Sequence, residues 1–216
     1  MSKTMYEVEQ RWEIAVAKYD AIKQQLRDLG FNEAKPAYVL DLYFNLLTAP
    51  KGRKRNVIEE GKLLRARFYR DKQDVNSDPN YPIEVTFKGP ADDGDVTRRE
   101  WEKKFKTLDA WHEWEQAKYK HGWIQVGSFL RLREAFQLPS YNPFEYGQVD
   151  WTVNIEGDYV VARSDPDKRF FSIEVPADNP RQKYAATRVR DSLADKLKLT
   201  KKEINTRSFL EMFILG

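Results

Sequence analysis

The sequence predicts an α+β protein in which an antiparallel eight-stranded β-barrel has a charged interior and helices packed on its outside. Two observations carry this prediction. Charged residues occupy every second position in at least six stretches of the 216-residue chain, and amphipathic segments long enough for helices lie between some of them. No internal repeat, linker or shift in composition divides the chain, so we expect a single domain covering residues 1–216.

The alternation of charged and apolar residues has the period of a β-strand. Glu7, Glu9 and Arg11 are separated by single residues, and Arg65 and Arg67 are spaced in the same way. Successive side chains of a strand point to opposite faces, so each stretch would have one charged face and one apolar face. Strands are therefore predicted at residues 5–14, 38–45, 62–70, 82–88, 96–106, 123–137, 145–155, 158–163 and 169–175.

Other segments have the period of an amphipathic helix, and such helices need an apolar surface to cover. In the first of them, Asp20 is a candidate N-cap and Gly30 a candidate stop. Helices are predicted at residues 20–29, 107–121, 179–199 and 206–214, and a solvated loop with a basic run at 51–55 is predicted at 48–60.

The composition excludes several kinds of site. The chain has no Cys, which rules out disulfides, thiolate metal sites and a thiol nucleophile. It has only two His residues, so neither a His-based triad nor a multi-His zinc site is expected. We expect both His side chains to be solvated. The net charge of +3 gives no overall attraction to nucleic acid or membranes. With no signal-like or membrane-length apolar run, we expect a cytoplasmic protein.

The predicted polar faces carry both signs of charge, and Arg and Glu are side chains that suit phosphate and hard metal ions. An ordinary half-buried sheet with its charged face in water explains any one stretch. Several such stretches together favour a charged interior, which is unfavourable unless ligands or partners neutralise it and is therefore a candidate site. The inward candidates are Arg11, Arg65, Arg67, Lys88, Arg98, Arg131 and Arg133, with Glu7, Glu9, Glu100, Glu102, Asp150 and Glu174.

In order and spacing, these motifs resemble those of the CYTH, or triphosphate tunnel metalloenzyme, family. Residues 7–11 resemble its E-x-E-x-K signature, and residues 41–44 with the K-G-P turn at 88–90 look closest to the branch of class IV adenylate cyclases and thiamine triphosphatase-like proteins. The remaining matches are residues 64–67 to L-R-x-R, 85–90 to L-T-x-K-G-P, 98–102 to R-x-E-x-E, 131–136 to K-x-R-x-x-Y and 207–211 to a closing S-Y-x-x-L helix.

The resemblance implies a hydrolase that binds a triphosphate in a barrel tunnel together with Mg²⁺ or Mn²⁺. The substrate would be a small molecule such as inorganic tripolyphosphate, a nucleoside triphosphate or thiamine triphosphate; membrane and nucleic-acid partners are not expected, and a homodimer is left open. The implied catalytic residues are Glu7, Glu9, Arg11 and Lys88. Those implied for substrate binding are Arg65, Arg67, Lys88, Arg98, Arg131 and Arg133, and the implied metal ligands are Glu7, Glu9, Glu100, Glu102, Asp150 and Glu174.

Three departures from the family pattern leave other functions open. Arg11 replaces the usual Lys, Ser172 stands where the last acidic strand carries a carboxylate, and residues 154–170 lengthen a hairpin. A class IV-type adenylate cyclase, which converts ATP to cyclic AMP and pyrophosphate, is one alternative. A non-catalytic module that binds polyphosphate or nucleotide is the other.

Overall fold

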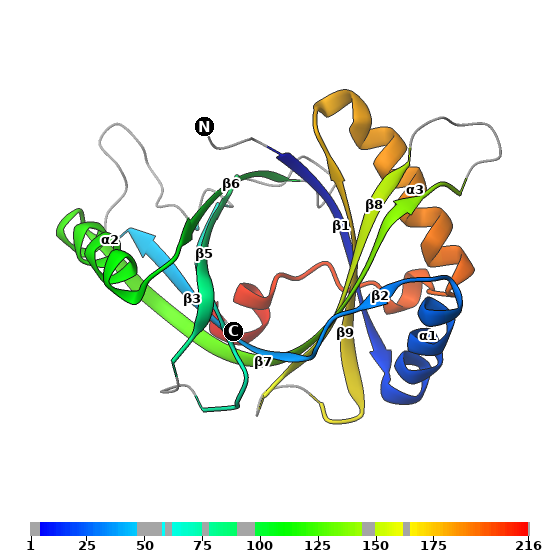
Figure 1. Cartoon of the computed structure of the whole chain (residues 1–216), viewed down its shortest axis with the longest axis horizontal. Coiled ribbons are helices and arrows are strands. Elements are labelled where there is room, and N and C mark those ends of the chain that lie inside the picture. Colours follow the sequence, from blue (N-terminus) through cyan, green and yellow to red (C-terminus); the bar gives the residue numbers. More distant parts are fainter. Residues whose placement is uncertain are drawn as a thin grey trace. The chain divides into compact units, whose positions relative to one another are not determined.

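The computed structural model describes residues 5–46, 58, 62–74, 78–89, 98–143, 150–161 and 165–215. Within these residues the chain forms nine strands and three α-helices in an antiparallel α+β fold (Figure 1). The strands are β1 (Met5–Ala15), β2 (Asn32–Glu33), β3 (Ala37–Leu46), β4 (Leu63–Arg70), β5 (Asn80–Lys88), β6 (Arg98–Phe105), β7 (Trp123–Tyr141), β8 (Trp151–Val160) and β9 (Lys168–Ala177). The helices are α1 (Val16–Asp28), α2 (Leu108–Lys120) and α3 (Lys183–Lys196), with short helices η1 (Pro180–Gln182), η2 (Lys201–Glu203) and η3 (Glu211–Leu215).

The antiparallel α+β class is confirmed, and closure of the strands into a barrel stays a prediction. The described residues contain nine strands, one more than the eight of the predicted barrel; one of them, β2, was not among the predicted ranges and makes a short pairing with β7 through Asn32 and Glu33. The basic loop predicted at 48–60 lies outside the described residues except for Ile58. None of the described helices combines the length and the apolar character needed to span a membrane.

The described residues group into two compact units. Unit 1 takes those within 37–131 and 208–215, and unit 2 takes those within 5–36 and 132–207. Strand β7 contributes its first part to unit 1 and its second part to unit 2.

In unit 1 the strand order is β7, β3, β4, β5 and β6. Register aligns Phe44 with Leu64 and Ala66 with Val85, so the even-numbered positions of β3 and β4 meet the odd-numbered ones of β5 on one apolar face. Helix α2 covers this face (Figure 1) through Trp111, which is 2% exposed. The Trp111 ring contacts the aromatic rings of Phe44, Phe68 and Phe105 with centroids 5.2–6.2 Å apart.

The ends of α2 follow the sequence prediction. The Thr107 hydroxyl accepts a hydrogen bond from the Ala110 backbone N–H at 3.3 Å, which caps the first turn. Gly122 follows the helix with φ of 81°, a left-handed conformation that favours glycine.

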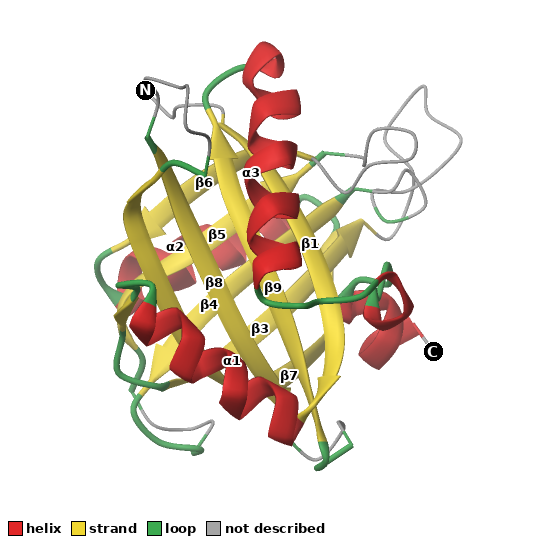
Figure 2. Cartoon of the chain, turned by 90° about the vertical axis from the view of Figure 1, so that its right-hand side faces the viewer, coloured by secondary structure: helices red, strands yellow, loops and turns green. Residues whose placement is uncertain are grey.

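In unit 2 the strand order is β1, β9, β8, β7 and β2. Helix α3 runs across β9, with β1 and β8 beside it (Figure 2), and α1 packs into the same core. The core is built from the apolar positions of β1, β8 and β9 and from the inner faces of the two helices: Val8, Trp12, Ile14, Tyr19, Ile22, Leu26, Val153, Ile155, Phe171, Ile173, Val175, Ala186, Val189 and Leu193.

Helix α1 begins four residues before the predicted start. Ala15 is its N-cap residue and makes no side-chain capping bond, whereas Asp20 lies inside the helix and pairs with Lys23 at 3.3 Å. The strand therefore runs directly into the helix, and the Val16 N–H is satisfied by the distant Asp167 carbonyl at 2.9 Å. Gly30 ends the helix as predicted, with φ of 84°.

The two strands predicted at 145–155 and 158–163 form one strand, β8. Gly157 lies inside it rather than in a turn. A side chain at this position would collide with the Tyr19 ring and hydroxyl, so the glycine allows α1 to pack closely on the strand.

Candidate functional site

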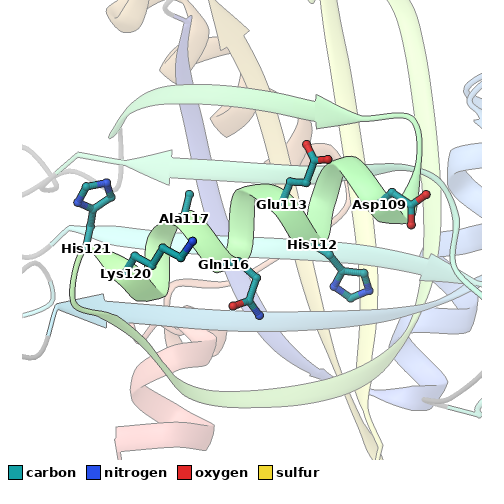
Figure 3. A pocket seen from close by; sticks show the side chains of 7 residues that line it. All are labelled: Asp109, His112, Glu113, Gln116, Ala117, Lys120 and His121. Atoms are coloured by element: carbon teal, nitrogen blue, oxygen red, sulfur yellow. The ribbon is translucent and has the colours of Figure 1, made fainter.

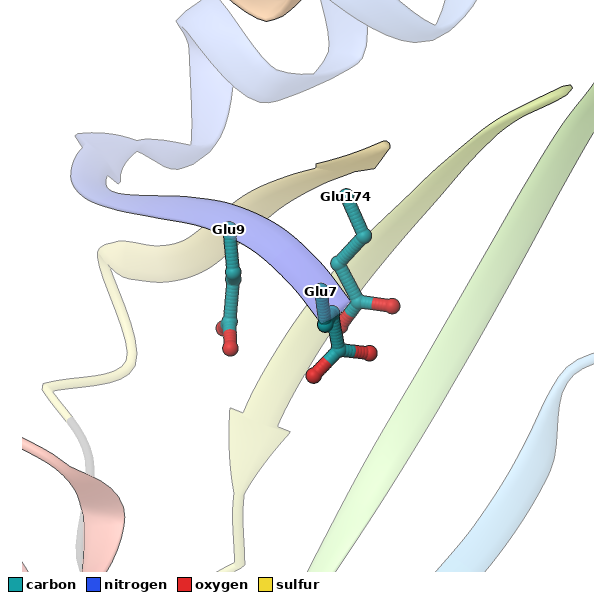
Figure 4. Close-up of side chains that lie close together, drawn as sticks. All are labelled: Glu7, Glu9 and Glu174. Atoms are coloured by element: carbon teal, nitrogen blue, oxygen red, sulfur yellow. The ribbon is translucent and has the colours of Figure 1, made fainter. Parts of the chain in front are cut away.

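Three carboxylates of unit 2 converge on the polar face of β1 and β9. Glu7 and Glu9 alternate with the buried Val8 on β1, and register sets Glu9 opposite Glu174 on β9. Each of the three offers an oxygen, and these oxygens lie within 4.8 Å of one another. The three side chains extend from the strands in the same general direction (Figure 4). Alternation on β1 and the pairing of β1 with β9 therefore bring together acids that are far apart in the sequence.

The chemistry of this group fits a divalent cation. Carboxylate oxygens are hard donors of the kind that Mg²⁺ and Mn²⁺ prefer. Three half-buried negative charges repel one another, and the contact of Arg11 Nη2 with Glu9 at 2.7 Å offsets part of that repulsion. Among the described residues, no other set of three or more Asp, Glu or His side chains brings its ligand atoms this close together.

Two side chains fix the strand that carries Glu7 and Glu9. Arg190 of α3 is 8% exposed and donates from Nη1 to the Glu9 backbone carbonyl at 3.4 Å. Arg11 donates from Nε to the Ser172 hydroxyl at 3.4 Å and from Nη1 to the Arg207 carbonyl at 3.3 Å. Arg190 is not among the residues predicted from the sequence, because a basic residue on an amphipathic helix normally lies at its solvent-facing edge.

In unit 1, three predicted phosphate-binding arginines meet at one buried acid. Asp41 on β3 is fully buried, and its Oδ1 accepts from Arg67 Nε at 2.9 Å. Its Oδ2 lies 2.8 Å from Arg131 Nη2, and its Oδ1 lies 3.8 Å from Arg65 Nε. One carboxylate thus aligns three guanidinium groups, and the cluster keeps a net positive charge.

The electrostatics of this cluster favour the ionised form of Asp41. Burial alone would raise the pKa of Asp41, but the positive charges of Arg131, Arg67 and Arg65 outweigh burial and lower it. Asp41 is not among the site residues predicted from the sequence. A lone acid in the otherwise apolar segment 38–44 was the available signal, since an unpaired charge there would be strongly unfavourable.

The other predicted residues of unit 1 lie along β5 and β6. Lys88 is half-buried at the end of β5, and register sets it opposite Glu100. Glu102 is exposed opposite Thr86. The backbones of Arg98 and Glu100 belong to β6, and their side chains lie outside the described part of the structure.

Two predicted residues of unit 2 have other partners. Arg133 donates from Nε and Nη2 to the two carboxylate oxygens of Asp158, both at 2.9 Å, and from Nη1 to Glu156. Asp150 is exposed and accepts a hydrogen bond from the Ser140 hydroxyl at 2.6 Å. Asp150 does not belong to the Glu7, Glu9 and Glu174 group.

A surface hollow lies along the outer side of α2 (Figure 3) and is lined by Asp109, His112, Glu113, Gln116, Ala117, Lys120 and His121. All of its side chains are exposed. His112 pairs with Glu115 at 3.5 Å within the same helix. Both His residues are therefore solvated, as predicted.

No family model matches the chain. No curated protein matches it in sequence either. Solved structures do match, over nearly the whole chain but at low identity. The PH1819 protein from Pyrococcus horikoshii is 21% identical with a TM-score of 0.66, and the match covers 97% of this chain and 98% of that one.

Two further matches carry functional names. A candidate adenylate cyclase from Vibrio parahaemolyticus is 15% identical with a TM-score of 0.65, covering 96% of this chain and 97% of that one. A candidate adenylyl cyclase from Hippeastrum that has a dominant triphosphatase activity is 11% identical with a TM-score of 0.59, covering 97% and 94%. At these identities the matches show a shared fold alone.

Proposed function

We propose that the protein is a divalent-metal-dependent hydrolase of a triphosphate. The observation that carries the proposal is the convergence of Glu7, Glu9 and Glu174 within 4.8 Å, in a chain that also gathers three arginines around one carboxylate. Such a pair of sites has the charges that a metal-bound polyphosphate requires. The similarity of fold to a protein with dominant triphosphatase activity supports the same proposal.

In this proposal Glu7, Glu9 and Glu174 hold Mg²⁺ or Mn²⁺. The ion would neutralise phosphate charge and promote ionisation of the attacking water. Arg11 forms an ion pair with Glu9 and donates a hydrogen bond to Ser172. These two contacts keep the Glu9 carboxylate directed to the polar face of β1. On the resemblance alone, Glu100, Glu102 and Asp150 are proposed as further ligands.

Phosphate oxygens are proposed to be bound by Arg65, Arg67 and Arg131, with Lys88, Arg98 and Arg133 as further donors. Asp41 holds three guanidinium groups before the substrate arrives, so little side-chain entropy is lost on binding. Stabilisation of the charge that develops on the transferred phosphoryl group is then mainly electrostatic.

The proposal includes an eight-stranded barrel whose interior is the triphosphate tunnel, in one functional domain of residues 1–216. We propose a cytoplasmic enzyme, which the lack of Cys supports. Inorganic tripolyphosphate, nucleoside triphosphates and thiamine triphosphate are the proposed substrates.

The experiment is product analysis by phosphorus NMR after incubation with ATP, tripolyphosphate or thiamine triphosphate, with Mg²⁺ or Mn²⁺ and with a chelator as control. We expect orthophosphate, released only when the metal is present. Pyrophosphate and cyclic AMP from ATP would instead identify the cyclase that the Vibrio match suggests. Tight binding of tripolyphosphate with no product would identify a binding module.

A further inference from the structure

Arg133 on β7 is one positive group between two carboxylates, the opposite of the arrangement around Asp41, where one carboxylate lies among several arginines. Three arginines share the one carboxylate of Asp41 in unit 1. In unit 2 a single guanidinium, that of Arg133, is shared by the two carboxylates of Glu156 and Asp158. The first cluster is net positive and attracts anions, whereas the second is net negative although it contains a candidate phosphate-binding arginine.

The two carboxylates hold Arg133 in different ways. Asp158 binds it as a fork through Nε and Nη2, and the Asp158 side chain is 1% exposed. Glu156 binds the remaining nitrogen, Nη1, and its side chain is 18% exposed. Asp158 is therefore the fixed partner of Arg133, and Glu156 is the partner that an incoming anion can replace.

The strand register explains why Glu156 is directed to Arg133. On β9 the residue opposite Glu156 is Ser172, which is neutral and 2% exposed. The Ser172 hydroxyl already accepts a hydrogen bond from Arg11 Nε. The Ser172 side chain therefore carries no charge of its own that could pair with Glu156.

We propose that Glu156 is a positioning residue that occupies the Nη1 arm of Arg133 until a polyanion displaces it. The inference rests on the proposed function, because it takes a triphosphate as the competing ligand. A phosphate oxygen that takes the Nη1 hydrogen held by Glu156 must replace this carboxylate, and no bond other than this hydrogen bond is exchanged. Glu156 therefore weakens binding of anions and favours ligands with several negative charges over a single phosphate.

The test is calorimetric titration of the metal-free protein with tripolyphosphate. We expect the Glu156→Gln variant to bind tripolyphosphate about tenfold more tightly than the wild type, since a charge-assisted contact no longer competes. Glu13→Gln is the matched control, because Glu13 is also a carboxylate of unit 2 but pairs with Lys168 at 3.0 Å. Its affinity should stay within about twofold of the wild type.

A double variant separates the specific contact from general electrostatics. In the Arg133→Lys background the single ammonium stays with Asp158, so Glu156→Gln should change the affinity by less than about twofold. An equal gain in both backgrounds would overturn the proposal. If Arg133→Lys does not fold, Glu156→Asp takes its place: this variant keeps the charge and withdraws the carboxylate, so a gain supports the contact and no gain overturns it.

The outcomes for the inference and for the proposed function are distinct. Wild-type binding of tripolyphosphate that Glu156→Gln leaves unchanged would overturn the role of Glu156 and leave the proposed function standing. Failure of the wild type and of every variant to bind tripolyphosphate without metal would overturn the role of Glu156, and failure that persists with Mg²⁺ or Mn²⁺ would overturn the proposed function as well.

Discussion

Asp41→Asn should remove a large part of the protein's stability. Asparagine keeps the size of the side chain but removes the negative charge that Arg131 and Arg67 contact at 2.8 and 2.9 Å. These arginines are 1% and 7% exposed, so their charges would be left buried without this partner. Breaking a buried ion pair on one side costs about 3–5 kcal/mol, against a total free energy of unfolding of about 5–15 kcal/mol.

Urea denaturation followed by tryptophan fluorescence measures this loss. With an m-value of about 2 kcal/mol/M, the midpoint should fall by about 2 M. The control is Glu33→Gln, which breaks the exposed pair with Arg27 at 2.8 Å and should cost less than about 1 kcal/mol. If Asp41→Asn lowers stability by no more than this control, Asp41 does not hold the arginine cluster.

The stabilisation by Asp41 should also depend on pH, in a direction that follows from its pKa. The pKa of Asp41 is lower in the folded protein than its ordinary value of 3.8, because the three arginines outweigh the opposing effect of burial. Ionised Asp41 therefore stabilises the folded state fully above about pH 4, and this contribution is lost as the pH falls through the folded-state pKa. The stability gap between wild type and Asp41→Asn should narrow below about pH 4; a gap that widens on acidification would refute the reasoning.

Two further predictions concern the backbone. Gly157→Ala should lower the free energy of unfolding by about 1–3 kcal/mol, because the new Cβ would collide with the Tyr19 hydroxyl, and Tyr19→Phe should restore part of the loss; equal melting temperatures for wild type and Gly157→Ala would contradict this contact. Lys198→Gly should raise stability by about 0.5–1 kcal/mol, because Lys198 is exposed and has φ of 56°, while its carbonyl still accepts from Lys18 Nζ. A lower melting temperature would show that the Lys198 side chain contributes more than the backbone strain.

The sequence could predict strands whose two faces differ in polarity. Residues 5–14 and 62–70 alternate so regularly that β1 and β4 were located to within a residue or two. The start of α1 could not be predicted in the same way. No side chain caps this end, and the Val16 N–H bonds Asp167, which is 151 residues away along the chain.

In the candidate site, too, the residues that alternate within one strand could be predicted, and the contacts between strands could not. Glu7, Glu9 and Glu174 follow from the alternation within their strands, whereas their proximity depends on the pairing of β1 with β9. The partners of Asp41 and of Arg133 could not be predicted, because they depend on which strands become neighbours. Treating 158–163 as a separate strand also hid the fact that Asp158 lies on β8.

Orthophosphate release from tripolyphosphate by the wild type, Glu174→Gln and Glu13→Gln tests the central claim most directly. Both variants remove one carboxylate from unit 2, but only Glu174 belongs to the converging group. The account predicts release that requires Mg²⁺ or Mn²⁺ in the wild type and in Glu13→Gln, and release slowed at least about a hundredfold in Glu174→Gln with metal-free binding of tripolyphosphate retained. Wild-type turnover that persists in a chelator, or full activity of Glu174→Gln, would contradict it.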